Sequence, residues 1–149
     1  MQLDLEDYKK DMVAHLLSDL TSGDRCKSLL SLRQIKNQVI GNKFKKNRFI
    51  KAGAVPLVVE FLKENLQLLG QPHGNEIETN RIKEALAQSV AALGSFACGS
   101  PEGLGHMLDS GGLEGLAATL AQIEDCQVNQ AGMRALKLVY AQQVCHGTK

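Results

Sequence analysis

The chain has very few aromatic side chains: it lacks tryptophan, and aromatic residues make up 4% of its 149 residues. Its core must therefore be built from Leu, Ile, Val and Ala, which suits close packing of helices. No apolar run approaches the ~18 residues that a membrane helix needs. The acidic first residues lack the apolar segment of a signal peptide. We therefore expect a cytoplasmic and nuclear protein with no membrane partner.

A dominant charge is missing too, since 17 basic and 16 acidic residues leave a net charge of +1. No overall field steers such a protein toward nucleic acid. The hydrophobic fraction of 44% is enough for one packed domain. The cysteines form no Cys-x-x-Cys pair and no disulfide framework, so we expect free, mostly buried thiols. They are Cys26, Cys98, Cys126 and Cys145.

Residues that could carry catalysis stand alone in the sequence. The histidines are His15, His73, His106 and His146. Only His146 has a neighbouring cysteine, and adjacent residues on a helix do not face each other, so this pair does not indicate a zinc site. The glycine-rich stretch at residues 99–105 lacks the Lys-Ser/Thr ending of a phosphate loop. We expect no enzyme activity, no metal and no cofactor.

The main positive feature of the sequence is a repeat. Residues 50–62 and 108–120 both place a glycine before a short apolar helix, and Gly53 and Gly111 are 58 residues apart. Two other pairs have the same spacing, Gly41 with Gly99 and Ile35 with Leu93. Each copy has an apolar face that it can bury only by stacking on its neighbours.

A third copy follows after a shorter step, because Ala135-Leu136 corresponds to Ala92-Leu93, 43 residues earlier. Steps of ~40–47 residues are typical of helical repeats, so the 58-residue step contains a surplus. Turn-forming residues at 71–76 place this surplus in an insertion loop, which we expect at residues 70–79.

Helical periodicity and capping residues predict a chain of helices, and no segment has the alternation of a strand. The expected helices span residues 5–20, 25–40, 44–51, 54–69, 81–98, 101–109, 113–123 and 126–144. They form a single domain with an N-terminal capping helix (1–23), first repeat helices (24–69), the insertion loop (70–79), second repeat helices (80–124) and the start of a truncated third repeat (125–149). On the last helix we expect an exposed apolar end at Leu136, Val139 and Val144 that self-associates or waits for a partner.

The order of a short helix, a Gly-x-apolar helix and a long alanine-rich helix resembles the armadillo repeat. This resemblance implies an all-α fold, an armadillo-type right-handed α-solenoid of about two to three repeats. Residues 32–42, the pair Lys45-Lys46, and residues 49–56 and 89–99 are similar to the N-terminal region of the armadillo repeat-containing protein 8 family, and residues 134–140 fit the same region. The resemblance covers about residues 24–140.

Members of that family are subunits of the CTLH/GID-type E3 ubiquitin ligase complex, which acts in proteasome-mediated protein catabolism. The resemblance implies a non-catalytic scaffold without the RING chemistry, whose partners are other subunits of the ligase. In the family, early repeats dock on the ligase core and later repeats hold the substrate receptor. Family members are much longer than this chain, so we expect the receptor-holding half to be absent from it, as in a fragment, a truncated gene product or a short paralogue.

The long helices of an armadillo stack line a concave groove, which leaves a second interpretation open: a free-standing adaptor that binds a short peptide. Importin-α-like proteins place Trp and Asn four residues apart in this groove. Only Asn37 matches that pattern, and the chain has no Trp. The candidate groove residues are Arg33, Asn37, Gln88, Ser95 and Arg134, and the alternative is that these side chains are only solvated.

The densest charge in the chain is a basic run formed by Lys36, Lys43, Lys45, Lys46, Arg48 and Lys51. It is a candidate docking patch for an acidic protein surface or for nucleic acid phosphates, or else a solvated face. Phe44 and Phe49 interrupt the run, and we expect both in the core, which disfavours nucleic acid. Charge reversal at Lys45 and Lys46 is expected to weaken docking if the patch is used.

Overall fold

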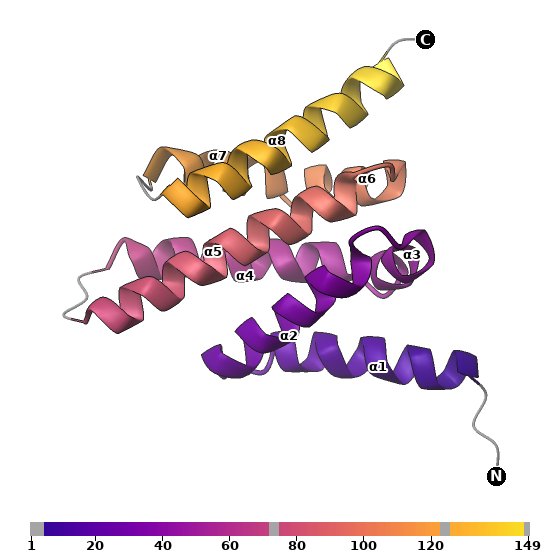
Figure 1. Ribbon diagram of the computed structural model, residues 1–149, viewed down its shortest axis with the longest axis horizontal. Coiled ribbons are helices and arrows are strands. Elements are labelled where there is room, and N and C mark those ends of the chain that lie inside the picture. The colour runs from indigo at the N-terminus through magenta and orange to yellow at the C-terminus, as the bar shows by residue number, and fades with distance from the viewer. Residues whose placement is uncertain (1–4, 72–74, 123–125, 148–149) are drawn as a thin grey trace.

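Helices account for the whole fold that the structure describes (Figure 1). The computed structural model covers residues 5–71, 75–122 and 126–147, and contains no β-strand there. In chain order the helices are α1 (Leu5–Leu20), α2 (Arg25–Val39), α3 (Lys43–Lys51), α4 (Ala54–Leu69), α5 (Glu76–Ala97), α6 (Pro101–Asp109), α7 (Gly112–Gln122) and α8 (Cys126–Gly147). The expected all-α class is confirmed. None of these helices is long and apolar enough to cross a membrane.

Side-chain caps explain where several helices begin. The Asp24 carboxylate accepts the backbone N–H of Lys27 at 3.1 Å at the start of α2. Asn42 caps α3 and Ser100 caps α6 in the same way, each accepting an N–H three residues later at 3.0 Å. These caps satisfy backbone donors that the first turn of a helix leaves unpaired. The two caps are themselves 58 residues apart.

Glycines in the left-handed region mark the turns of the repeat. Gly41 (φ 71°) and Gly99 (φ 66°) follow α2 and α5, whereas Gly53 (φ 87°) and Gly111 (φ 80°) precede α4 and α7. Residues with a Cβ rarely adopt these angles, which explains why glycine recurs at the same spacing. The unit α2–α3–α4 is therefore repeated in the backbone of α5–α6–α7.

The long helices lie side by side in one layer (Figure 1). Helix α5 packs between α2 and α8, and α4 and α7 form a second layer behind them. The short helices α3 and α6 join the layers at one end, and α1 packs along α2. This arrangement leaves the outer sides of α2, α5 and α8 on one broad face.

The apolar core runs between the two layers, with α5 at its centre. Its fully buried side chains on α5 include Ile82, Leu86, Val90, Leu93 and Phe96. Gly94 allows α8 to come close, because a Cβ at this position would lie 2.9 Å from the Cα of Ala135. The small residues of α5 thus permit close helix packing, as the alanine-rich sequence predicts.

The surplus residues of the 58-residue step do not all lie in the expected loop at residues 70–79. Helix α5 already begins at Glu76, because Asn75 caps it by accepting the N–H of Ile77 at 2.9 Å. Acidic residues in its first turn also favour a helix N-terminus. Part of the surplus lies in α4, which has 16 residues against 11 in the equivalent α7. Residues 72–74 are outside the described part of the chain.

Three expectations about burial are wrong. Phe49 is buried as expected, but Phe44 is 83% exposed because it points away from the core side of α3. Cys26 and Cys98 are free, as expected, but exposed, since both lie at helix ends. The side chains of Cys126 and Cys145 lie outside the described residues. The third expectation was an exposed apolar end on the last helix. In the structure Leu136 is half-buried and Val139 is buried.

The apolar stripe of α8 therefore packs inward instead of forming an exposed end. It is covered by α5 and α7, which both contact α8. Among the described side chains of α8, the large apolar ones that are exposed are Met133 and Tyr140. The side chain of Val144, which was expected to extend this apolar end, lies outside the described residues.

Candidate functional site

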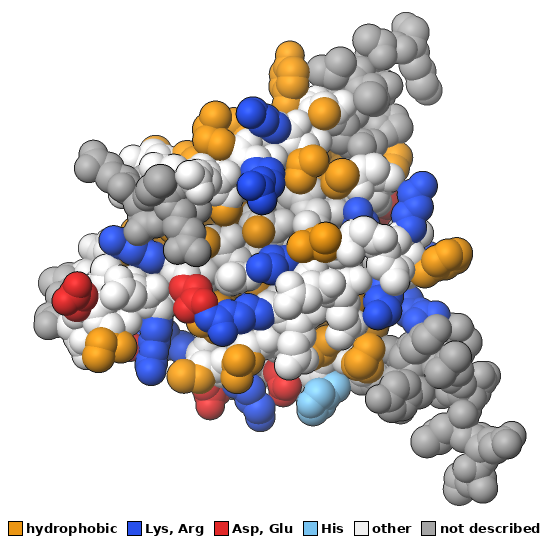
Figure 2. Space-filling model, viewed as in Figure 1, with side chains coloured by type: hydrophobic (Ala, Val, Ile, Leu, Met, Phe, Trp, Pro, Cys, Tyr) orange, Lys and Arg blue, Asp and Glu red, His pale blue; other side chains and the backbone are white. Residues whose placement is uncertain are grey.

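The candidate groove residues lie on the three long helices that form the broad face (Figure 2). Arg33 and Asn37 are one turn apart on α2, Gln88 and Ser95 are on α5, and Arg134 is on α8. Asn37 and Arg134 are exposed, whereas Ser95 and Gln88 are half-buried. The side-chain oxygen of Gln88 is buried without a hydrogen-bond partner.

Arg33 is held by a neighbouring helix. Its guanidinium forms an ion pair with Glu84 of α5. A second pair joins the same two helices, in which Arg25 donates to both carboxylate oxygens of Glu78 at 2.9 Å. Partly exposed pairs of this kind contribute about 0–1 kcal/mol each. They connect the first unit to the second, so Arg33 already has a partner within the protein.

The basic run divides into one buried residue and several surface residues. Lys46 is 8% exposed, and its ammonium donates to the backbone carbonyl of Cys98 at 2.8 Å. This carbonyl follows the last turn of α5, where backbone acceptors lack partners in the helix and a cation is favoured by the helix dipole. Lys46 therefore links α3 to the end of α5, which removes it from the set of surface cations.

The other cations surround the outer side of α3. Lys43 and Lys51 are exposed, and Lys36, Lys45 and Arg48 are half-buried. Figure 2 shows basic and hydrophobic side chains together at the α3 end of the face. The exposed hydrophobic residues of this part of the chain include Phe44 of α3, 83% exposed, and Ile40 just after α2, 56% exposed. The surface thus combines positive charge with uncovered apolar area.

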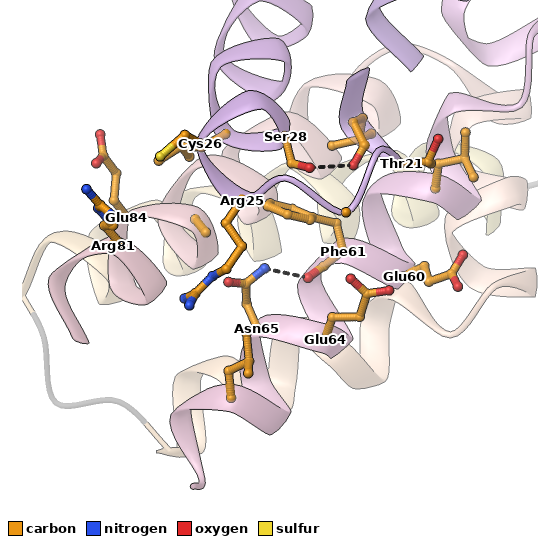
Figure 3. A pocket seen from close by; sticks show the side chains of 16 residues that line it. Thr21, Arg25, Cys26, Ser28, Glu60, Phe61, Glu64, Asn65, Arg81 and Glu84 are labelled. Carbon is orange, nitrogen blue, oxygen red and sulfur yellow. Dashed lines mark hydrogen bonds between the residues drawn. The ribbon is translucent and has the colours of Figure 1, made fainter. Parts of the chain in front are cut away.

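A cleft of about 320 Å³ lies between the α1–α2 turn, α4 and α5 (Figure 3). Its charged lining residues are Arg25, Glu60, Glu64, Arg81 and Glu84. Apolar walls come from leucines and Phe61, and Asn65 donates to the Phe61 carbonyl at 2.8 Å. Figure 3 shows Arg25 extending toward Asn65, with Arg81 and Glu84 on the α5 side.

Sequence reasoning missed this cleft because its lining comes from segments far apart in the chain. One local signal was present, since Glu60 and Glu64 are one turn apart and so share a face of α4. The cleft can offer ion pairs of both signs to a polar segment. Across the part of the chain that the structure describes, no group of three or more His, Cys, Asp or Glu side chains is arranged to hold a metal ion.

Neither a protein-family model nor a curated protein sequence matches the chain. Among solved structures, it is similar to the crystal structure of an engineered protein from the Northeast Structural Genomics Consortium, with a TM-score of 0.70 and 24% identity. That similarity covers 91% of this chain and 49% of the engineered protein, so the chain spans about half of its length. At this identity the likeness concerns the fold alone.

Another engineered protein from the same consortium has a TM-score of 0.42 and 20% identity, over 85% of this chain and 62% of that one. This similarity is too low to support an argument about fold or function.

Proposed function

We propose that this protein is a non-catalytic scaffold for protein–protein interaction, built from armadillo-type repeats in a right-handed solenoid. The observation that carries the proposal is the recurrence of left-handed glycines and side-chain caps at one spacing in two stacked helix units. Stacked helix units with a continuous core present broad surfaces, which repeat proteins use to bind partners.

The proposed partner assembly is a CTLH/GID-type E3 ubiquitin ligase. The segments similar to the armadillo repeat-containing protein 8 family lie at residues 32–42, 49–56 and 89–99. They include the ends of α2 and α5, each with the glycine turn that follows, and the turn between α3 and α4. Lys46 lies between the first two segments in the sequence and donates to the carbonyl of Cys98 in the third, so the resemblance concerns parts of the chain that lie close together in the fold.

The experiment is affinity purification of the tagged full chain from its native cells, followed by mass spectrometry. We expect recovery of the ligase's RING subunits and its Ran-binding-type scaffold subunits. The matched control is Gly94→Val, in which the added side chain would press against Ala135 and separate α5 from α8. If the wild-type chain recovers ligase subunits and the Gly94→Val chain does not, the proposal is supported. A folded wild-type chain that recovers no ligase subunit contradicts it.

A second candidate is a free-standing adaptor that binds a short peptide, and the cleft between α2, α4 and α5 favours it. Its carboxylates at Glu60 and Glu64 would attract a basic peptide. Titration with a labelled Lys/Arg-rich peptide tests this function, with Glu60→Gln/Glu64→Gln as the variant. Peptide binding that the double variant weakens, without recovery of ligase subunits, would favour the adaptor over the ligase scaffold.

A further inference from the structure

Positive charge is concentrated in one quarter of the chain. No Asp or Glu occurs from Arg25 to Val59, although the whole chain has nearly equal numbers of both signs. The same segment contains nine of the 17 basic residues. Nine charges of one sign within α2 and α3 generate a local positive field that the net charge of +1 hides.

Part of this charge is balanced within the protein. Arg25 pairs with Glu78, Arg33 with Glu84, and Lys46 bonds the Cys98 carbonyl. The excess charge lies around α3, which has no acidic residue and carries Lys43, Lys45 and Lys51 besides the buried Lys46. An opposite charge from outside the protein would therefore be most favourable at this helix.

An uncovered apolar side chain lies among these cations. Phe44 is 83% exposed, whereas Phe49, five residues later, is 1% exposed. Helical spacing places Arg48 and Lys51 on the same side as Phe44, since residues three, four and seven positions apart share a face. Ile40, 56% exposed, precedes the turn into α3. Lys43, the exposed first residue of α3, lies next to Phe44 along the helix. We call Ile40, Lys43, Phe44 and Lys51 the α3 patch.

We propose that the α3 patch binds an acidic segment of a partner protein, with an apolar side chain of that segment covering Phe44. This inference rests on the proposed scaffold function and names the chemistry of one docking site. The cations select an acidic partner by charge complementarity. The phenylalanine supplies apolar area of the kind that anchors protein interfaces. Ile40 favours a peptide over nucleic acid, because an aliphatic side chain offers no flat surface for a base to stack on.

The test uses fluorescence anisotropy with three labelled probes at about 0.15 M ionic strength. The first is a short Glu/Asp peptide with a central Leu-Phe pair, the second has Ser in place of that pair, and the third is a short oligothymidine. The protein variants are Phe44→Ser, Lys43→Glu and Lys51→Glu. Lys137→Glu is the matched control, because Lys137 is exposed on α8 and gives the same change of charge.

The proposal predicts that the Leu-Phe peptide binds most tightly. Phe44→Ser should lower the affinity for that peptide about tenfold and change the affinity for the Ser peptide by less than about twofold, because only the first peptide loses an apolar contact. Each charge reversal in the α3 patch should lower the affinity for both peptides about threefold, because a lysine at the edge of the interface no longer attracts their carboxylates. Lys137→Glu should leave both affinities unchanged.

Two results would overturn the proposal. One is an equal loss of affinity for both peptides in the Phe44→Ser variant, which would mean that the phenylalanine does not contact the apolar pair of the ligand. The other is tighter binding of oligothymidine with a steep salt dependence, which is the behaviour of a phosphate-binding surface.

Purification of the same variants separates this inference from the proposed function. If the wild-type chain recovers ligase subunits and the Phe44→Ser and Lys51→Glu chains recover as much, the scaffold function stands and the α3 patch is wrong as the docking site. If the wild-type chain recovers none, the ligase assignment fails, and the peptide result alone decides whether the α3 patch binds acidic segments.

Discussion

The two short helices, α3 and α6, occupy equivalent places in the repeat but have opposite surfaces. Each has nine residues, follows a left-handed glycine and begins at a capping side chain. Helix α3 contains five basic residues and no acidic one, whereas α6 contains Glu102 and Asp109 and neither Lys nor Arg. Turns and caps thus determine the shared backbone, and they leave the surface free to differ between copies.

The inner sides of the two helices differ as well. Lys46 of α3 corresponds to Leu104 of α6, which is buried in the core. Lys45 corresponds to Gly103, where a Cβ would collide with the carbonyl oxygen of Phe96. The second copy therefore packs its short helix tightly against α5. The first copy leaves room for a lysine and presents charge on its outer side.

The largest expected effect on the contrast between α3 and α6 comes from Gly103→Ala, which tests the tight packing of α6. The added Cβ would lie 2.9 Å from the carbonyl carbon of Phe96, and backbone cannot rotate away as a side chain can. Alanine gains about 1 kcal/mol in helix propensity over glycine. We expect overpacking to exceed this gain and to lower the free energy of unfolding by about 2 kcal/mol net. Urea denaturation followed by circular dichroism measures the loss.

Lys45→Ala is the matched change in α3. Because Lys45 is half-buried and its backbone position already accommodates a side chain, we expect a change within about 0.5 kcal/mol. Equal losses at the two positions would show that α3 and α6 are held equally tightly, which would remove the contrast between the copies.

The helix ends could be predicted from the sequence because their causes are local. Asp24, Asn42 and Ser100 cap helices within three residues of themselves, and Gly53 and Gly111 meet a backbone requirement at their own positions. The start of α5 was missed because Asn75 and Glu76 read as turn residues, although the same residue types form a cap and a first turn.

The burial of α3 and the cleft could not be predicted, because both depend on distant segments. Phe44 and Phe49 have the same chemistry, and only the positions of the neighbouring helices decide which one is covered. Lys46 finds its acceptor 52 residues later in the chain, at Cys98. A sequence pattern gives the period of a helix face but does not say which partner covers that face.

An intermediate effect is expected for Lys46→Met, which changes the buried lysine to an apolar residue of similar length. The long side chain still packs, but the Cys98 carbonyl loses its charged donor. We expect the free energy of unfolding to fall by about 1–2 kcal/mol. Lys51→Met, on the exposed side of the same helix, is the control, with an expected change of less than about 0.5 kcal/mol. Similar values for both would mean that the bond to Cys98 adds no stability.

Charge reversal at Lys46 is a poor test of docking, because Lys46 is buried and its replacement by an acid would disturb the fold.

The smallest expected effect on stability is that of Phe44→Ser. An 83% exposed ring has little packing to lose, so we expect a change within about 0.5 kcal/mol. Phe49→Ala, in the same helix, should by contrast cost about 3–5 kcal/mol, because it empties a buried site. Thermal unfolding at two protein concentrations measures the stability of both variants.

If Phe44→Ser lowers the unfolding midpoint only at the higher concentration, the ring is covered by a second copy of this chain, and the α3 patch is then a contact between copies. If the midpoint is unchanged at both concentrations, Phe44 is uncovered in solution, and its exposure is available to a partner of different sequence.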